Sequence, residues 1–150
     1  MDLNRYTGMW YEIAKIPNRF QKDCASNTTA RYELREDGKI SVTNRCLDND
    51  GNVLEINGVA KVVDEHSNAK LKVSFVSIFG WHLFWGDYWI IGLGKDYEYA
   101  IVGDPERKYG WILSRTDRLD EDKMNEIFSQ LKSNGYNPYK FEFSKQNTGN

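Results

Sequence analysis

Few residues of this chain could perform covalent or metal chemistry: two cysteines, Cys24 and Cys46, and two histidines, His66 and His82. A cysteine nucleophile needs a base close by, and neither histidine is near a cysteine in the sequence. Two cysteines alone do not make a zinc site, and the histidines lack the spacing of metal ligands. The sequence therefore predicts no catalytic residue, no metal and no cofactor.

The two cysteines can instead pair with each other. The turn from Glu36 to Lys39 predicts a hairpin between two strands, and this hairpin brings Cys46 close to the segment that contains Cys24. The geometry permits a disulfide, which would indicate an oxidising compartment, and two reduced thiols are the alternative.

Length and composition limit the classes of protein to consider. The 150 residues fit a single domain spanning residues 1–150, and a net charge of −2 offers no basic surface for nucleic acid. Five Trp, nine Tyr and seven Phe suit a β-rich fold or an apolar cavity. No apolar run reaches the ~18 residues of a membrane-spanning helix. The N-terminus lacks an apolar signal region, so we expect the native export signal to be missing from this chain.

Alternating apolar and polar residues predict a series of strands joined by short polar turns. The segments lie at residues 9–16, 28–35, 40–44, 53–63, 71–76, 87–93, 99–103 and 109–116. Consecutive strands of this number favour an eight-stranded up-and-down antiparallel β-barrel over a sandwich, and such a barrel has room for one small ligand. In the first strand, Gly8, Trp10, Glu12 and Ala14 are expected to share one face.

The period of the apolar residues changes after the last strand. Asp120 is a good N-cap, and apolar residues then recur at helical spacing up to Leu131, before Gly135 ends the pattern. We therefore predict one C-terminal α-helix packed outside the barrel, followed by an extended segment at 140–143 that adds to the sheet edge.

Three short motifs, far apart in the sequence, meet at one end of such a barrel: Gly8-x-Trp10 at the start of the first strand, Asp96-Tyr97 in a turn, and Arg115 at the end of the last strand. Arg115 can stack its guanidinium on the Trp10 ring. These structural motif residues would close one end and leave the other open.

With these motifs in order and spacing, the chain resembles the lipocalin family. Runs such as Trp10-Tyr11-Glu12-Ile13-Ala14 and Trp111-Ile112-Leu113-Ser114-Arg115-Thr116 are similar to its bacterial (Blc-type) and apolipoprotein D branch. The resemblance implies a carrier that binds, stores or transports a small hydrophobic ligand, such as a fatty acid or lysophospholipid. It also implies a place in the cell envelope, periplasmic or attached to the outer membrane, or secretion. Some similar proteins are isomerases with a cysteine inside the barrel, but Cys24 lies in a predicted loop.

The inward faces of the strands supply the candidate ligand-binding residues: Ala30, Tyr32, Val42, Ala60, Val73, Phe75, Trp85, Tyr88, Ile90 and Trp111. Small residues at 58, 60 and 92 are expected to leave volume free. A barrel filled by its own side chains is the alternative. A different function, a protein-interaction module that uses the loops at the open end, also remains open.

The segment 78–86 is rich in aromatic residues and is expected to be a loop at the open end. We expect Phe79, Trp81, Phe84 and Trp85 to form a portal that contacts membrane lipid. A homodimer interface, or rings folded inward over the cavity, would explain the same residues.

Overall fold

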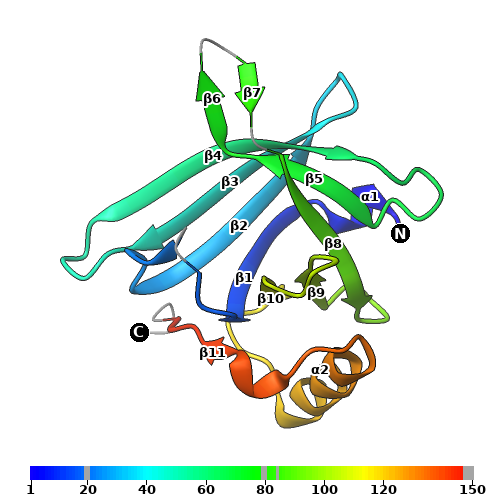
Figure 1. The fold of residues 1–150 in the computed structure, drawn as a ribbon. Helices are drawn as coiled ribbons and strands as arrows, with labels where there is room; N and C mark the ends of the chain where they lie inside the picture. The colour runs from blue at the N-terminus through cyan, green and yellow to red at the C-terminus, as the bar shows by residue number, and fades with distance from the viewer. Residues whose placement is uncertain (19–20, 79–80, 84, 147–150) are drawn as a thin grey trace.

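The predicted alternation of apolar and polar residues corresponds to the strands of a closed sheet. The computed structural model (Figure 1) describes residues 1–18, 21–78, 81–83 and 85–146, and of 76–78 and 81–83 it describes the backbone alone. The strands of the barrel are β1 (Gly8–Lys15), β2 (Ser26–Leu34), β3 (Ile40–Leu47), β4 (Val53–Val62), β5 (Lys70–Ser74), β8 (Gly86–Leu93), β9 (Tyr99–Gly103) and β10 (Gly110–Ser114).

Each of these strands pairs antiparallel with its neighbour, and β10 pairs back with β1 to close the sheet. At this closure Tyr11 lies opposite Ser114, and Glu12 lies opposite Leu113. The predicted eight-stranded up-and-down antiparallel barrel is confirmed. Strand β3 continues past its predicted end at Asn44 to Leu47, because it pairs with β4 along its whole length.

Strand β1 changes partner halfway along. Its first half pairs with β2, whereas Ala14 and Lys15 pair with β11 (Glu142–Phe143), a short strand outside the barrel. The register with β10 shifts between Glu12 and Ala14, and such a bulge turns the side chains that follow it. The prediction that Ala14 shares a face with Trp10 is therefore wrong: Ala14 packs outside the barrel.

The two ends of the barrel differ. Turns 35–39, 63–69 and 94–98 lie at one end with the short helix α1 (Leu3–Tyr6); we call this the closed end. Residues 16–18 and 21–25 and turns 48–52 and 104–109 lie at the other, the open end. There the sequence predicts a loop over 78–86, whereas β6 (Val76–Ile78) and β7 (Trp81–Leu83) form a separate hairpin that projects from the barrel (Figure 1).

Helix α2 (Glu121–Ser133) is the predicted C-terminal helix, and it packs on the outside of the barrel (Figure 1). The Asp120 side chain accepts a hydrogen bond from the backbone N–H of Lys123 at 2.8 Å, which caps the first turn. Ile127 and Leu131 are fully buried in an outer cluster with residues of β9 and β10. A 3-10 helix, η2 (Pro138–Lys140), then leads into β11.

Candidate functional site

Arg115 closes one end of the barrel. Its Cζ lies 3.7 Å from the centroid of the Trp10 ring, and its two terminal nitrogens donate to the backbone carbonyls of residues 5, 6, 7 and 9. Gly8 adopts φ +102°, and a Cβ there would lie 3.3 Å from Arg115 Nη1. The indole N–H of Trp10 donates to Tyr6 O at 2.8 Å. We call Trp10 with Arg115 stacked on it the Trp10 plug. The hydrogen bonds of the plug satisfy its buried polar groups.

The second motif lies beside this plug. The Tyr97 hydroxyl accepts a hydrogen bond from the backbone N–H of Asp2 at 2.8 Å, and Arg5 Cζ lies 4.2 Å from the Tyr97 ring centroid. Asp96 is exposed in the same turn. The three motif segments thus lie together at the closed end.

The predicted ligand-binding residues, with one exception, pack into a single interior cluster. The exception is Trp85, whose ring lies 4.2 Å from Lys61 Nζ. Lys61 alternates with the inward residues Ala60 and Val62, so its position faces out of the barrel. The prediction that Trp85 lines the interior is wrong, because Tyr88 faces inward and the alternation of β8, extended back from it, places position 85 on the outer face. Of the other proposed portal residues, Phe79 and Phe84 and the side chain of Trp81 lie outside the described part of the chain.

The interior is closely packed toward the closed end. Tyr6, Tyr32 and Tyr88, with aliphatic neighbours such as Leu71, leave a cavity of about 10 Å³, close to the minimum for one water molecule. The expected free volume at 58 and 92 is absent. A Cβ on Gly58 would lie 2.7 Å from the Phe75 ring, and one on Gly92 would lie 2.4 Å from Gln130 of α2, outside the barrel.

The interior opens to solvent along β4. Leu54 and Ile56 alternate with Gly58 and Ala60, so they lie on the inward face of the strand, yet they are 37% and 50% exposed. Residues 53–57 pair with β3, and the described ladder between β4 and β5 begins only at Val59. The sequence analysis missed these two residues. Extending the alternation of β4 back from Gly58 would have found them.

Three tyrosine hydroxyls meet inside the barrel above the Trp10 plug. The Tyr88 hydroxyl donates to that of Tyr32 at 2.8 Å and lies 2.5 Å from that of Tyr6. Burial raises the pKa of Tyr32 to about 12, and it raises the pKa of Tyr6 and Tyr88 as well. The three phenols are therefore neutral over the physiological range. Tyr6 was not expected here, because it belongs to α1 and not to a strand.

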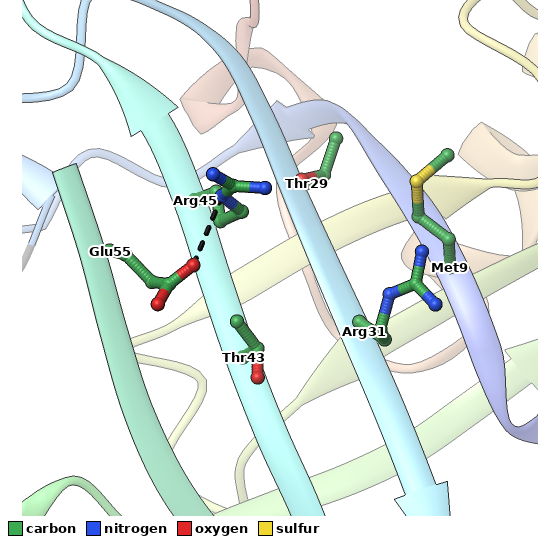
Figure 2. Close-up of a pocket in the computed structure, with 6 residues that line it drawn as sticks. All are labelled: Met9, Thr29, Arg31, Thr43, Arg45 and Glu55. Atoms are coloured by element: carbon green, nitrogen blue, oxygen red, sulfur yellow. Dashed lines mark ion pairs between the residues drawn. The ribbon is translucent and has the colours of Figure 1, made fainter. Parts of the chain in front are cut away.

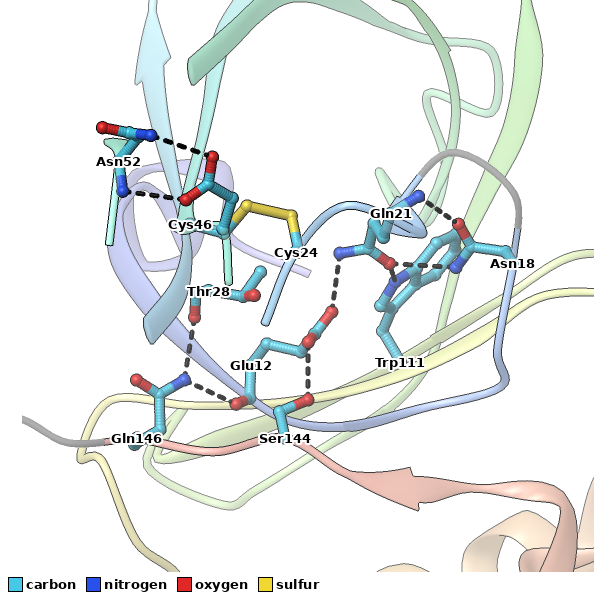
Figure 3. Close-up of a disulfide and its surroundings, with 11 residues drawn as sticks. Glu12, Asn18, Gln21, Cys24, Thr28, Cys46, Asn52, Trp111, Ser144 and Gln146 are labelled. Atoms are coloured by element: carbon cyan, nitrogen blue, oxygen red, sulfur yellow. Dashed lines mark hydrogen bonds between the residues drawn. A yellow bond between two sulfur atoms is a disulfide. The ribbon is translucent and has the colours of Figure 1, made fainter. Parts of the chain in front are cut away.

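A buried carboxylate, Glu12, joins three segments near the open end (Figure 3). Its Oε1 accepts from Gln21 Nε2 at 2.8 Å, and its Oε2 accepts from the Ser144 hydroxyl at 2.5 Å. Burial raises the pKa of Glu12, and the hydrogen bonds from Ser144 and Gln21 lower it by less. Gln21 Oε1 in turn accepts from the indole N–H of Trp111 at 3.0 Å. Glu12 thus holds the first loop against a residue of the interior.

The expected disulfide is present. Cys24 and Cys46 are bonded, with Cα atoms 5.6 Å apart, and this disulfide fastens the first loop to β3 (Figure 3). Both cysteines are therefore oxidised and offer no thiol nucleophile. Within the described residues, no group of three or more His, Cys, Asp or Glu side chains could hold a metal ion. No helix among them is long and apolar enough to cross a membrane.

A second hollow, of about 330 Å³, lies on the outer face of β1–β4 (Figure 2). Its residues alternate with inward ones such as Trp10, Ala30 and Val42. Arg45 Nε lies 3.1 Å from Glu55 Oε1. The residues that line the hollow are mostly polar: Met9, Thr29, Arg31, Thr43, Arg45 and Glu55. Exposed ion pairs of this kind are strongly solvated, so this hollow does not suit a hydrophobic ligand.

Comparison with known proteins agrees with this geometry. Residues 1–146 match the family described as lipocalin-like domain. Temperature-induced lipocalin-1 of Arabidopsis thaliana is 38% identical over 97% of this chain and 80% of its own length. The outer membrane lipoprotein Blc of Escherichia coli K12 is 37% identical (97% and 79%), as is apolipoprotein D of Macaca fascicularis (97% and 77%).

Solved structures show the same fold at lower identity. Apocrustacyanin C2 superposes with a TM-score of 0.77 at 18% identity, over 98% of this chain and 81% of that one. The cockroach allergen Per a 4 gives 0.74 at 21% identity, over 97% and 88%. Barrel, closing motifs and sequence relatives agree, and the chain belongs to the lipocalin family.

Proposed function

We propose that this protein binds, stores or transports a small hydrophobic ligand in its barrel, of the class of fatty acids, lysophospholipids or similar lipids. The observation that carries the proposal is the opening of the barrel interior to solvent along β4. There the inward-facing Leu54 and Ile56 are 37% and 50% exposed and continue the interior face formed by Ala60. Apolar side chains that face inward and yet meet water are available to a ligand.

The energy of burying an acyl chain is sufficient for useful affinity. Each CH₂ group removed from water contributes about 0.8 kcal/mol, so about ten groups correspond to micromolar binding. The ligand would enter beside Leu54 and Ile56 and extend along Val73 and Phe75, which are half-buried in the interior cluster. These two side chains change rotamer to admit it, because the cavity below them is about 10 Å³.

A carrier fits the chemistry of the chain better than an enzyme does. The two cysteines form a disulfide, and the buried carboxylate of Glu12 is occupied by Gln21 and Ser144. We place the protein in the cell envelope or outside the cell. The disulfide supports an oxidising compartment, and the bacterial relatives are named outer membrane lipoproteins.

The test measures the binding of hexadecanoate to the delipidated protein. Trp fluorescence and native mass spectrometry both monitor this binding. We expect micromolar binding by the wild type and a loss of about tenfold in Ile56→Ser. Leu34→Ser is the matched control, because Leu34 is similarly exposed (41%) but lies at the closed end. No binding of hexadecanoate or lysophosphatidylcholine by the wild type would overturn the proposal. That result would favour the protein-interaction module instead.

A further inference from the structure

The three hydroxyls of Tyr6, Tyr32 and Tyr88 hold one hydrogen more than they use. Each phenol supplies a single O–H donor, and the group contains two hydrogen bonds. Because Tyr88 donates to Tyr32, Tyr6 must donate to Tyr88. The hydrogen of Tyr32 is then left without an acceptor among the described residues. A buried donor without a partner is unfavourable, so this hydrogen is a recognition element that is ready for an incoming oxygen.

The surroundings select the kind of oxygen. Two charged side chains act on these tyrosines: the buried carboxylate of Glu12 adds to the rise in the pKa of Tyr32, and the guanidinium of Arg115 opposes the rise in the pKa of Tyr6. Glu12 would repel an anion, and the terminal nitrogens of Arg115 already donate to four backbone carbonyls beside the Trp10 ring. An ionised carboxylate or phosphate at the hydroxyls would lack a counter-charge, and burying an unpaired charge is far more costly than burying a neutral oxygen.

The size of the neighbouring space fits one atom. The cavity of about 10 Å³ is lined by all three tyrosines, so it accepts a single oxygen and no bulky headgroup. The position is also reachable along the proposed ligand path, because Val73 lines the same cavity and Phe75 follows it on the inward face toward the open end.

We infer that the Tyr6–Tyr88–Tyr32 hydroxyl group is a subsite for a neutral oxygen, a hydroxyl or carbonyl, at the inserted end of the hydrophobic ligand. Any charged group of the ligand then stays at the open end, in water. The inference rests on the proposed function and narrows it: lipid alcohols and ketones insert oxygen first, whereas fatty acid anions insert methyl first.

The test compares three ligands of equal chain length, decan-1-ol, decane and decanoate at pH 8, on variants that keep every ring. The Tyr6→Phe/Tyr32→Phe/Tyr88→Phe triple variant removes all three hydroxyls, and Tyr32→Phe removes the one with the unused hydrogen. We expect decan-1-ol to bind about fivefold more weakly to the triple variant, with a smaller loss in Tyr32→Phe, while decane and decanoate change less than about twofold.

Tyr99→Phe is the matched control. Tyr99 is equally buried, but its hydroxyl accepts from Gln130 of α2 outside the barrel, so its loss should leave all three affinities unchanged. Equal changes for the three ligands, or none for decan-1-ol, would overturn the subsite. If the wild type binds none of the three, the proposed function fails with it. If decanoate binds and decan-1-ol shows no dependence on the hydroxyls, only the subsite fails.

Discussion

The indole N–H of Trp111 donates to Gln21 Oε1 over 3.0 Å, which ties a residue of the barrel interior to the first loop. The amide of Gln21 has one orientation here, because an indole can only donate and the carboxylate of Glu12 can only accept. The position of Trp111 near the open end therefore depends on Glu12, which is 2% exposed.

Glu12 should give the protein a pH-dependent stability. Its pKa in the folded state is raised above 4.5, so the folded state binds the proton more tightly than the unfolded state. The contribution of Glu12 to the free energy of unfolding is thus fully present below pH ~4.5 and falls as pH rises through the folded-state pKa. Glu12→Gln should lack this pH dependence of the free energy of unfolding. Its stability relative to wild type should therefore increase with pH.

Urea unfolding from pH 4 to 8 measures this difference. Glu12→Gln still accepts from Gln21 and donates to Ser144, so it should cost less than about 1 kcal/mol. Glu12→Ala removes the acceptor of the half-buried Gln21 amide and Ser144 hydroxyl, and it should cost about 1–3 kcal/mol. An identical pH profile for wild type and Glu12→Gln would show that Glu12 does not titrate in this way.

Replacing Arg115 should destabilise the closed end strongly. Arg115→Ala removes the stack on Trp10 and takes the side-chain donor away from the carbonyls of residues 5, 7 and 9, which should cost about 3 kcal/mol. Arg115→Lys keeps the charge but lacks the planar fork of donors, so it should recover little. Chemical denaturation measures both, and Arg118→Ala, an exposed arginine on the same segment, should be neutral. Full rescue by lysine would show that charge alone matters.

Loss of the disulfide should lower stability by about 3 kcal/mol, as expected for a closed segment with a sequence separation of 22. The Cys24→Ser/Cys46→Ser variant and reduced wild type should unfold at the same, lower temperature. If dithiothreitol lowers the melting temperature of the double variant as well, the reductant acts elsewhere and the comparison does not report on this bond.

Gly58→Ala should cost about 2 kcal/mol. Its Cβ would lie 2.7 Å from the Phe75 ring and 2.6 Å from the carbonyl oxygen of Ser74. Because the backbone is one of the two obstacles, adding Phe75→Leu should restore only part of the loss. Gly86→Ala is the control, since its Cβ would meet only an ordinary contact at 3.9 Å and should cost less than about 1 kcal/mol. A neutral Gly58→Ala would mean that the strands separate easily here.

The sequence predicts the regular elements well where local pattern and packing agree. Period-two alternation identifies the barrel strands, and the cap at Asp120 identifies the start of α2. The short helix α1 was not predicted. It has one turn, and its carbonyls are bonded by Arg115, more than 100 residues away, so no local pattern specifies it.

The candidate site is predicted in part, for similar reasons. Alternation places Tyr32 and Tyr88 inside the barrel, but it cannot show that Tyr6 joins them from a helix. It also cannot show that the ring of Phe75 fills the space at Gly58, because this depends on how the chain leaves β5. Spacing fixes the direction of a side chain, while free volume is decided by its distant neighbours.

Strand β1 pairs with β2 along its first half and with β11 at its end, and this arrangement has a consequence for solubility. Strand β11 covers the edge of Ala14 and Lys15, beyond the point where the pairing of β1 with β2 stops at Tyr11. An uncovered strand edge is a template on which another chain can pair, the first step of aggregation. Removing the last ten residues would expose this edge, so the C-terminal strand protects the protein against self-association as well as completing its fold.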